Sequence, residues 1–243
     1  MSLLAAAIGL SLIGSFGGLL LASALLLFRD PLRTRVIPWL VSYAVGALLG
    51  VSLLALLPEA LETLTPTRTF GTLLAGILTF FVLEKLVLWR HCHTHDCEVH
   101  GTTTSLILIG DAFHNFIDGA VIATAVLTSM PLGLNTALAV TAHEIPQEVG
   151  DFAILLASGY SRSRALWLNV LSGASGVLGT LVGYVAVEQV PLIKPYVLTL
   201  AAASFLYVAM SDLIPDLHRG RIDAKGFRQV ILIAAGIATV VAF

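Results

Sequence analysis

The chain alternates between long apolar stretches and short polar breaks. The breaks hold most of the charged residues and fall at positions 29–35, 62–69, 90–101, 128–134, 159–164, 188–194 and 218–228. A membrane-spanning helix needs about 20 mostly apolar residues. The pattern predicts eight such helices, over residues 3–28, 37–60, 69–89, 103–127, 135–158, 165–187, 196–217 and 226–243. A soluble bundle would instead need a polar position every three or four residues along each helix, and stretches such as 10–28 lack one.

Composition agrees with a protein that lies mostly in a membrane. Hydrophobic residues make up 57% of the 243 residues and charged residues only 12%, with a mean hydropathy of +0.94. Soluble domains carry about 25% charged residues. The composition excludes a disordered chain, a coiled coil, a nucleic-acid-binding protein and an ordinary soluble enzyme. We therefore expect an all-α polytopic membrane protein that forms a single domain over residues 1–243.

The basic residues predict how the chain is oriented. Lys and Arg accumulate in cytoplasmic loops, and eleven of the 13 basic residues lie in or beside loops on one side. The opposite loops hold only Arg68 and Lys194. This bias places both termini outside and makes the loop at 90–101 cytoplasmic. We expect a multi-pass protein of a cell membrane, and the Ala, Leu and Arg bias favours a bacterial inner membrane.

One long stretch carries acidic residues without any basic partner. No Lys or Arg lies between Arg90 and Arg162, yet this stretch contains seven carboxylates: Asp96, Glu98, Asp111, Asp118, Glu144, Glu148 and Asp151. The last five lie inside two predicted membrane helices. An acidic residue at the centre of such a helix costs about 2.5 kcal/mol or more, so five cost on the order of 10 kcal/mol. Protons, a distant basic helix or a bound cation must supply the missing positive charge.

The spacing of these residues favours a metal ion. One face of the helix over 103–127 carries Asp111, His114, Asn115 and Asp118, at i, i+3 or i+4 positions. The helix over 135–158 carries His143, Glu144, Gln147, Glu148 and Asp151. Because a short loop joins the two helices, they should pack antiparallel with these faces together. Imidazole and carboxylate ligands suit zinc, and also iron, manganese or nickel.

The two helices repeat one pattern in opposite directions. Each places a His first, an oxygen donor next to it and a third donor at +4: His114 and Asp118 in one, His143 and Gln147 in the other. This repeat predicts a pseudo-twofold site at mid-membrane, as in transporters built from inverted repeats. A weaker similarity relates residues 57–59 (Leu-Pro-Glu) to residues 214–216 (Ile-Pro-Asp). These two sequences lie at the two ends of one ion path, or their similarity is a coincidence.

Four acidic residues have two interpretations each. Glu59 is an entrance ligand or a hydrated residue at a helix end. Asp212 and Asp216 guide metal along the seventh helix or cap the membrane interface. Asp111 likewise belongs to the ion path or supports Asn115.

Two motifs resemble those of a known family. Residues 114–119 read His-Asn-Phe-Ile-Asp-Gly, and residues 143–151 read His-Glu-Ile-Pro-Gln-Glu-Val-Gly-Asp. Both resemble the ZIP family of divalent-metal transporters, in the branch with HNFxDG and HEIPxExGD motifs. The predicted eight spans, the outward termini and the His-rich loop are similar to that family, and so is the segment 206–215.

The resemblance implies a binuclear metal centre between the fourth and fifth helices of a ZIP-type bundle. The first site would comprise His114, Asp118, His143 and Gln147. The second would comprise Asn115, Asp118, Glu144 and Gln147, with Asn169 or Ser172 from the sixth helix. Gln147 stands where this branch commonly has a second His, which leaves room for iron or manganese.

The same resemblance implies transport toward the cytoplasm by rigid-body motion of one helix bundle against another. The expected cargo is zinc, with iron, manganese and cadmium as other divalent candidates. The expected partners are membrane lipid and a second copy of the chain in a homodimer, and no nucleic acid.

Two other functions remain open from the sequence. His143 and Glu144 begin like the H-E-x-x-H motif of an intramembrane zinc metallohydrolase, but that motif needs a second His at +4, where Gln147 lies. A proton-coupled carrier of an organic cation would use the carboxylates. It would leave His114 and His143 without a role.

The loop between the third and fourth helices is rich in metal-binding residue types: His91, Cys92, His93, His95, Cys97 and His100. Such a composition is typical of metal binding, and a cytoplasmic location would keep the thiols reduced. The alternative is a polar linker without an essential role.

Overall fold

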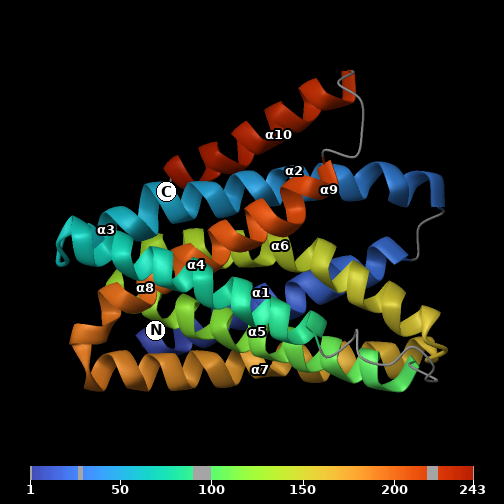
Figure 1. Ribbon diagram of the computed structural model, residues 1–243, viewed down its shortest axis with the longest axis horizontal. Coiled ribbons are helices and arrows are strands. Elements are labelled where there is room, and N and C mark those ends of the chain that lie inside the picture. The colour runs from blue at the N-terminus through green and yellow to red at the C-terminus, as the bar shows by residue number, and fades with distance from the viewer. Residues whose placement is uncertain (1, 27–29, 90–99, 218–223, 243) are drawn as a thin grey trace.

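The described part of the chain is helical throughout. A computed structural model describes residues 2–26, 30–89, 100–217 and 224–242, and these contain no strand. Six helices are uninterrupted: α1 (Leu3–Leu26), α4 (Pro66–Trp89), α5 (His100–Thr128), α6 (Met130–Ala157), α7 (Arg162–Gln189) and α10 (Ala224–Val241). Most of them run roughly along the long axis of the molecule, whereas α10 lies obliquely to it (Figure 1).

Two further segments combine α-helix with a wider π-helical turn. The first runs through α2 (Asp30–Val51), the turn η1 (Ser52–Leu56) and α3 (Leu57–Leu61). The second follows the short 3-10 turn η2 (Pro191–Ile193) and runs through α8 (Lys194–Tyr207), the turn η3 (Val208–Leu213) and α9 (Ile214–Leu217). Counted in this way, the described residues form eight helical segments, and the predicted all-α fold is confirmed.

A proline follows each π-helical turn. Pro58 follows η1 and Pro215 follows η3. Proline lacks an N–H group, and its ring clashes with the carbonyl four residues earlier, here that of Leu54 or Ser211. The wider π turn relieves this clash, and such turns occur often at functional sites. The two Leu/Ile-Pro-acid sequences therefore share a backbone irregularity as well as a residue pattern.

Five helical stretches are long and apolar enough to cross a membrane: Leu3–Leu25, Arg35–Leu61, Pro66–Lys85, Arg162–Gln189 and Pro191–Leu213. Gly226–Val241 is a shorter apolar helix. The helices α5 and α6 are absent from this set because acidic residues, histidines and amides lower their hydropathy. Eight spans and outward termini stay predictions.

Several helix ends differ from those expected. The helix predicted over 135–158 begins at Met130, because the Ser129 side chain accepts a hydrogen bond from the Leu132 N–H (3.3 Å) and Pro131 lies in the first turn. The helix expected at 103 begins at His100, and that expected at 37 begins at Asp30. For α6, the Ser129 cap extends the helix beyond the apolar stretch.

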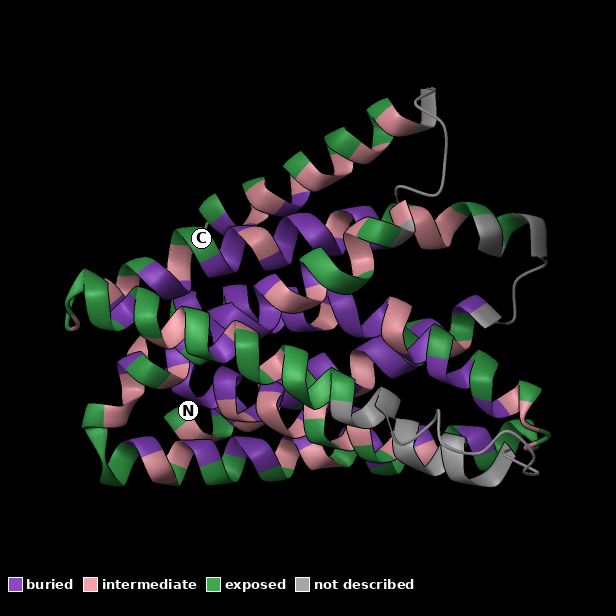
Figure 2. Ribbon diagram, viewed as in Figure 1, coloured by how far each residue is buried: buried purple, intermediate pink, exposed green. Residues whose placement is uncertain are grey.

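The helices α5 and α6 lie at the centre of the bundle. The helix α5 packs against α7, α6, α1 and α8, and α6 packs against α1, α2 and α5. Two outer helices each lie on a single main neighbour, α10 on α2 and α4 on α8. Buried residues accordingly gather on the central helices, whereas the outer faces of α4, α7 and α10 are exposed (Figure 2).

Glycines bring α5 into backbone contact with α7. A Cβ atom at Gly119 would overlap the carbonyl group of Gly176, and one at Gly179 would overlap that of Phe116. Small residues permit this close approach between membrane helices. The pair α5–α7 is therefore closely packed next to the polar face of α5.

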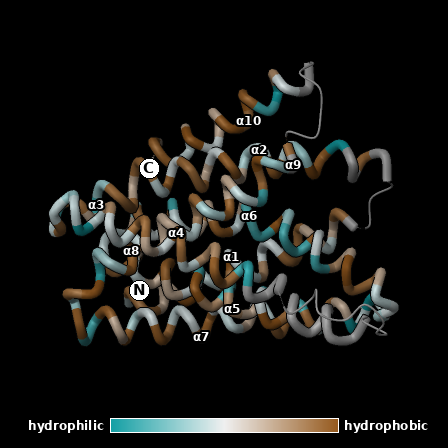
Figure 3. The backbone as a smooth tube through the Cα atoms, in the orientation of Figure 1, coloured by the Kyte–Doolittle hydropathy of each residue, from teal (hydrophilic) through white to brown (hydrophobic). Residues whose placement is uncertain are grey.

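The outward faces are apolar. On α4 the exposed side chains include Phe70, Leu74, Leu78, Phe81 and Val82, and hydrophobic residues likewise dominate the outer helices in Figure 3. Soluble monomers rarely expose continuous apolar patches of this kind. A lipid environment accounts for them.

Candidate metal centre

Two histidines from different helices meet at the centre of the bundle. The Nε2 atoms of His114 on α5 and His143 on α6 lie 3.0 Å apart. Oδ2 of Asp118, one turn after His114, lies 3.1 Å from Nε2 of His143 and 3.5 Å from Nε2 of His114. The i, i+4 spacing on α5 thus directs an imidazole and a carboxylate at the same point.

Glu144 completes a cluster of four residues. Its Oε1 atom lies 3.9 Å from Nε2 of His143. One ligand atom from each of His114, Asp118, His143 and Glu144 lies within 4.8 Å of the other three. His143, Asp118 and Glu144 are buried and His114 is half-buried. Two imidazoles and two carboxylates form a ligand set that suits zinc and other first-row divalent ions.

Contacts around His143 fix the direction of its ring. Its Nδ1 atom lies 3.0 Å from the carbonyl oxygen of Ala139, so an Nδ1–H donates to this carbonyl. The lone pair of Nε2 then faces His114 and Asp118, which is how ligating histidines are usually oriented. The ring of Phe205 on α8 also packs against His143, with 5.8 Å between centroids. Nothing in the local spacing of α6 indicates Phe205, because this contact comes from the other half of the chain.

The acidic residues in and around this cluster lie close to one another. Glu144 and Glu148 are fully buried, and none of their carboxylate oxygens has a hydrogen-bond partner. Like-charge interactions connect Glu144 with Asp111, Asp118, Glu148 and Asp151. Within the described ranges, no Lys or Arg forms an ion pair with any of these acids. Because a buried unpaired charge is strongly unfavourable, a bound cation fits this arrangement.

Asp111 links the two central helices. Its Oδ1 atom accepts hydrogen bonds from Nδ2 of Asn115 (3.2 Å) and from Nε2 of Gln147 (2.8 Å). The sequence left Asp111 either in the ion path or as a support for Asn115. The hydrogen bond from Asn115 favours the second interpretation. The amide oxygens of Asn115 and Gln147 remain as donors for a cation.

Two polar residues of α7 provide further groups that could bind a metal ion. Asn169 and Ser172 are buried, and neither the Asn169 amide atoms nor the Ser172 hydroxyl has a hydrogen-bond partner. The Oδ1 atom of Asn115 on the adjacent α5 is likewise without one. Buried polar atoms are normally paired, so these atoms are suited to a ligand.

A close approach from α1 lies behind Glu144. A Cβ atom at Gly18 would lie 2.7 Å from the Cβ atom of Glu144. A side chain at position 18 would therefore displace Glu144. The sequence shows Gly18 only as one of many membrane-helix glycines and does not reveal this contact.

The other sequence-predicted residues lie away from the four-residue cluster or outside the described part. Glu59 lies half-buried in α3, and Asp212 lies exposed in η3, where it accepts a hydrogen bond from the Ser211 hydroxyl (3.0 Å). Asp216 is in α9 and His100 begins α5, but their side chains are not described. The loop residues His91, Cys92, His93, His95 and Cys97 lie outside the described residues.

Comparisons with known proteins show the family to which this chain is similar. The family model described as ZIP Zinc transporter matches residues 88–243. The Zinc transporter ZIP13 of Pongo abelii is 35% identical over 236 residues, which cover 87% of this chain and 69% of that protein. Human Zinc transporter ZIP13 is 30% identical (87% of this chain, 73% of that protein). Zinc transporter YKE4 of Saccharomyces cerevisiae is 30% identical (76% of this chain, 63% of that protein).

The chain belongs to the ZIP zinc transporter family. It is therefore a membrane protein of metal transport and not an enzyme, which removes the metallohydrolase from consideration. An organic-cation carrier likewise has no support, since the matched relatives are named zinc transporters.

Proposed function

We propose that this protein carries zinc and related divalent ions across a membrane, toward the cytoplasm, through the cluster of His114, Asp118, His143 and Glu144. The observation that carries the proposal is the convergence of these four ligand atoms within 4.8 Å, among buried acids that pair with no Lys or Arg in the described part of the chain. A divalent ion would provide the missing charge. The names of the relatives support zinc as its identity.

We further propose a second ion next to the first. Asp118 and Glu144 would be shared, with the amides of Asn115 and Gln147 as additional ligands of the second ion. Asn169 or Ser172 on α7 would complete it. The support is that the polar atoms of Asn169, Ser172 and Asn115 Oδ1 are buried and unpaired. Ligand sets of mixed oxygen and imidazole bind less tightly than thiolate sites, which suits an ion that must leave again.

Acidic residues at both ends of the bundle would form the path. Glu59 lies near the C-terminal end of the second helical segment, and Asp212 and Asp216 lie near the C-terminal end of the seventh. Asp111, Glu148 and Asp151 extend the acidic surroundings of the centre along α5 and α6. The His- and Cys-containing segment at 90–101 would receive the ion on the cytoplasmic side.

The pattern of helix contacts supports an inverted repeat. The contact of α1 with α6 has a counterpart in that of α7 with α5, and the contact of α2 with α10 has one in that of α8 with α4. The turn before Pro58 matches the turn before Pro215. These pairings relate the first three helical segments to the last three, with α5 and α6 between them. Rigid-body movement of a bundle that contains α4 and α8 against a bundle that contains α5 and α6 would expose the centre to either side.

Gln147 is the residue on which metal choice should depend. An amide is a weaker zinc ligand than imidazole, and oxygen donors suit manganese and other harder ions better. Iron, manganese and cadmium are therefore the competitors to test. Residence in a bacterial inner membrane and assembly as a homodimer remain parts of the proposal.

The test is metal uptake into proteoliposomes with zinc alone and with competing iron, manganese or cadmium. We expect His114→Ala and Glu144→Ala to abolish uptake, whereas Gln147→His shifts competition toward zinc. The control is Glu188→Ala, which removes an exposed acid at the far end of α7. Equal uptake by wild type, His114→Ala and Glu144→Ala would refute the site.

A further inference from the structure

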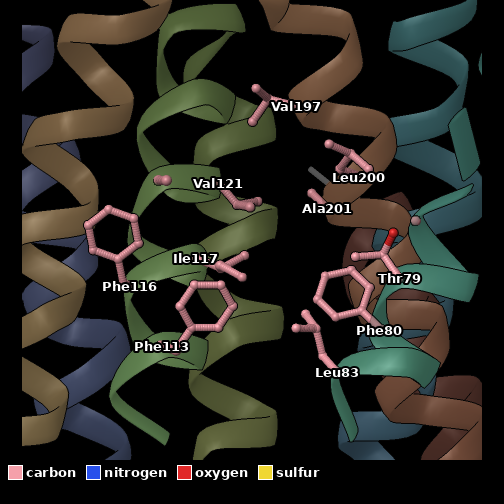
Figure 4. Close-up of a pocket in the computed structure, with 12 residues that line it drawn as sticks. Thr79, Phe80, Leu83, Phe113, Phe116, Ile117, Val121, Val197, Leu200 and Ala201 are labelled. Atoms are coloured by element: carbon pink, nitrogen blue, oxygen red, sulfur yellow. The ribbon is translucent and has the colours of Figure 1, made fainter. Parts of the chain in front are cut away.

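An apolar cavity lies on the other side of α5 from the metal centre. It has a volume of about 260 Å³ and is bounded by α4, α5 and α8 (Figure 4). Its walls include Phe80 and Leu83 from α4, Phe113 and Ile117 from α5, and Val197 and Leu200 from α8. In Figure 4 the side chains of α4 and α5 face one another across the gap.

The described residues that line the cavity offer no free polar group to a ligand. Thr79 is the one polar side chain among its lining residues, and its hydroxyl donates to the carbonyl oxygen of Ala75 at 2.8 Å. Binding sites for metabolites and drugs normally combine apolar walls with a few directed polar groups. This lining therefore suits a hydrocarbon ligand.

The cavity is continuous with the lipid-facing surface. On α4, the neighbours of the lining residues Thr79 and Phe80 are Leu78 and Phe81, which are exposed large apolar side chains. The helix α4 packs mainly against α8 and α3, so its remaining faces meet the surrounding hydrocarbon. In a bilayer, the hydrocarbon that meets this surface is the acyl chain of a lipid.

The dimensions fit one acyl chain. The volume is below the roughly 300–1,000 Å³ of sites for drug-sized ligands. From Phe113 to Val121 the wall extends along α5 for about 12 Å at 1.5 Å per residue, which is close to half of the ~30 Å hydrocarbon thickness of a bilayer. A single chain from one leaflet matches this length.

The position of the cavity links it to the transport site. Phe113 and Ile117 are the sequence neighbours of His114 and Asp118, so one wall of the cavity is the back of the metal-binding helix. The opposite wall includes α8, the helix whose Phe205 contacts His143. A ligand in the cavity therefore lies between α5 and α8, the two helices that move relative to each other in the proposed transport.

We propose that this cavity binds one lipid acyl chain and that the bound chain sets the rate at which α4 and α8 move past α5 during transport. A chain is compressible and can leave, whereas a rigid side chain in the same space would hold the helices apart. This inference extends the proposed function and assigns a separate ligand to a separate site.

Binding is tested without any measurement of transport. Proteoliposomes of phosphatidylcholine containing phosphatidylcholine with a diazirine in one acyl chain are illuminated, and labelled peptides are identified by mass spectrometry. We expect labels to concentrate on Phe80, Phe113 and Leu200, which line the cavity, over Leu74 and Leu78, which are exposed outside it. In Thr79→Trp this labelling should fall about tenfold, because an indole and an acyl chain cannot share a close-packed space.

The matched control is Leu78→Trp, which adds the same side chain to the adjacent exposed position outside the cavity. It should leave labelling of Phe113 and Leu200 unchanged. A second filling variant, Leu200→Phe, acts from α8 and repeats the test if Thr79→Trp does not fold. Zinc-dependent protection against thermal aggregation identifies the folded variants.

Transport is measured on the same proteoliposomes. We expect Thr79→Trp to lower the maximal uptake rate about fivefold with little change in KM for zinc, since the ligands are untouched. Labelling that is uniform along α4, or that persists in Thr79→Trp, would refute the site. Labelling that depends on Thr79 combined with unchanged uptake by Thr79→Trp would refute the regulatory role. Labelling at the cavity in a protein that transports no metal would count against the proposed function alone.

Discussion

The Nε2 atom of His143 on α6 lies 3.1 Å from Oδ2 of Asp118 on α5. This contact joins the two central helices at the point where His114 also arrives. We predict that Asp118→Asn, which keeps the shape but removes the charge, weakens zinc binding about 100-fold or more, since changes even to supporting partners of metal ligands cost 10–100-fold.

Calorimetry of the purified protein in detergent measures this affinity. Glu188→Gln is the matched control, because it makes the same chemical change at an exposed position. Zinc affinity in Asp118→Asn equal to that of the control would remove Asp118 from the ligand set.

The close approach of α1 to Glu144 gives a prediction in which no metal-binding residue is substituted. In Gly18→Ala the new Cβ would lie 2.7 Å from Glu144 Cβ and would displace this carboxylate, so zinc affinity should fall about tenfold. In Gly17→Ala the nearest atom to the new Cβ would be 3.8 Å away, which is an ordinary contact. Titration of both variants with zinc checks the difference, and equal affinities would place Glu144 outside the binding site.

The amide of Asn169 should stabilise the metal-bound protein, in which it would bind the second ion. It should destabilise the metal-free protein, in which it has no hydrogen-bond partner. A buried polar group without a partner costs about 1–3 kcal/mol, so Asn169→Leu should raise the melting temperature in the presence of a chelator. The same variant should lose one bound zinc ion in equilibrium dialysis. A variant that retains the wild-type zinc stoichiometry would show that Asn169 does not bind the second ion.

The glycine contact between α5 and α7 predicts a large effect on stability. In Gly119→Ala the new Cβ would overlap the backbone of Gly176, and the loss should be about 3 kcal/mol, at the upper end for overpacked positions. Gly110→Ala on the same helix meets no atom within 4 Å and should gain up to about 1 kcal/mol from helix propensity. Thermal unfolding in detergent compares the two. Similar melting temperatures would indicate that α5 and α7 are not held in backbone contact.

Periodic features of the sequence predicted most of the helices and the residues that meet at the centre. The i, i+4 pairs place His114 beside Asp118 on one face, and a short connection makes α5 and α6 antiparallel neighbours. Both relationships are local, so they follow from the sequence. The repeated Pro-acid pattern at Pro58 and Pro215 was also visible in the sequence. The π-helical turns before these prolines were not, because they depend on how each helix relieves the proline clash.

Contacts between distant segments were not predictable in this way. Phe205 reaches His143 from α8, and Gly18 approaches Glu144 from α1, so neither contact has a local signal. The hydrogen bond from Gln147 to Asp111 likewise depends on the relative height of α5 and α6, which spacing along one helix does not fix. The cavity beside α4 arises because α4 packs on α8 and leaves its side toward α5 open.

The most direct test of the central claim is anomalous diffraction at the zinc edge from crystals grown with zinc. The account predicts a peak between α5 and α6, about 2.0–2.1 Å from Nε2 of His143 and within bonding distance of Asp118. Zinc that is bound only elsewhere on the protein, with no peak between these two helices, would contradict it.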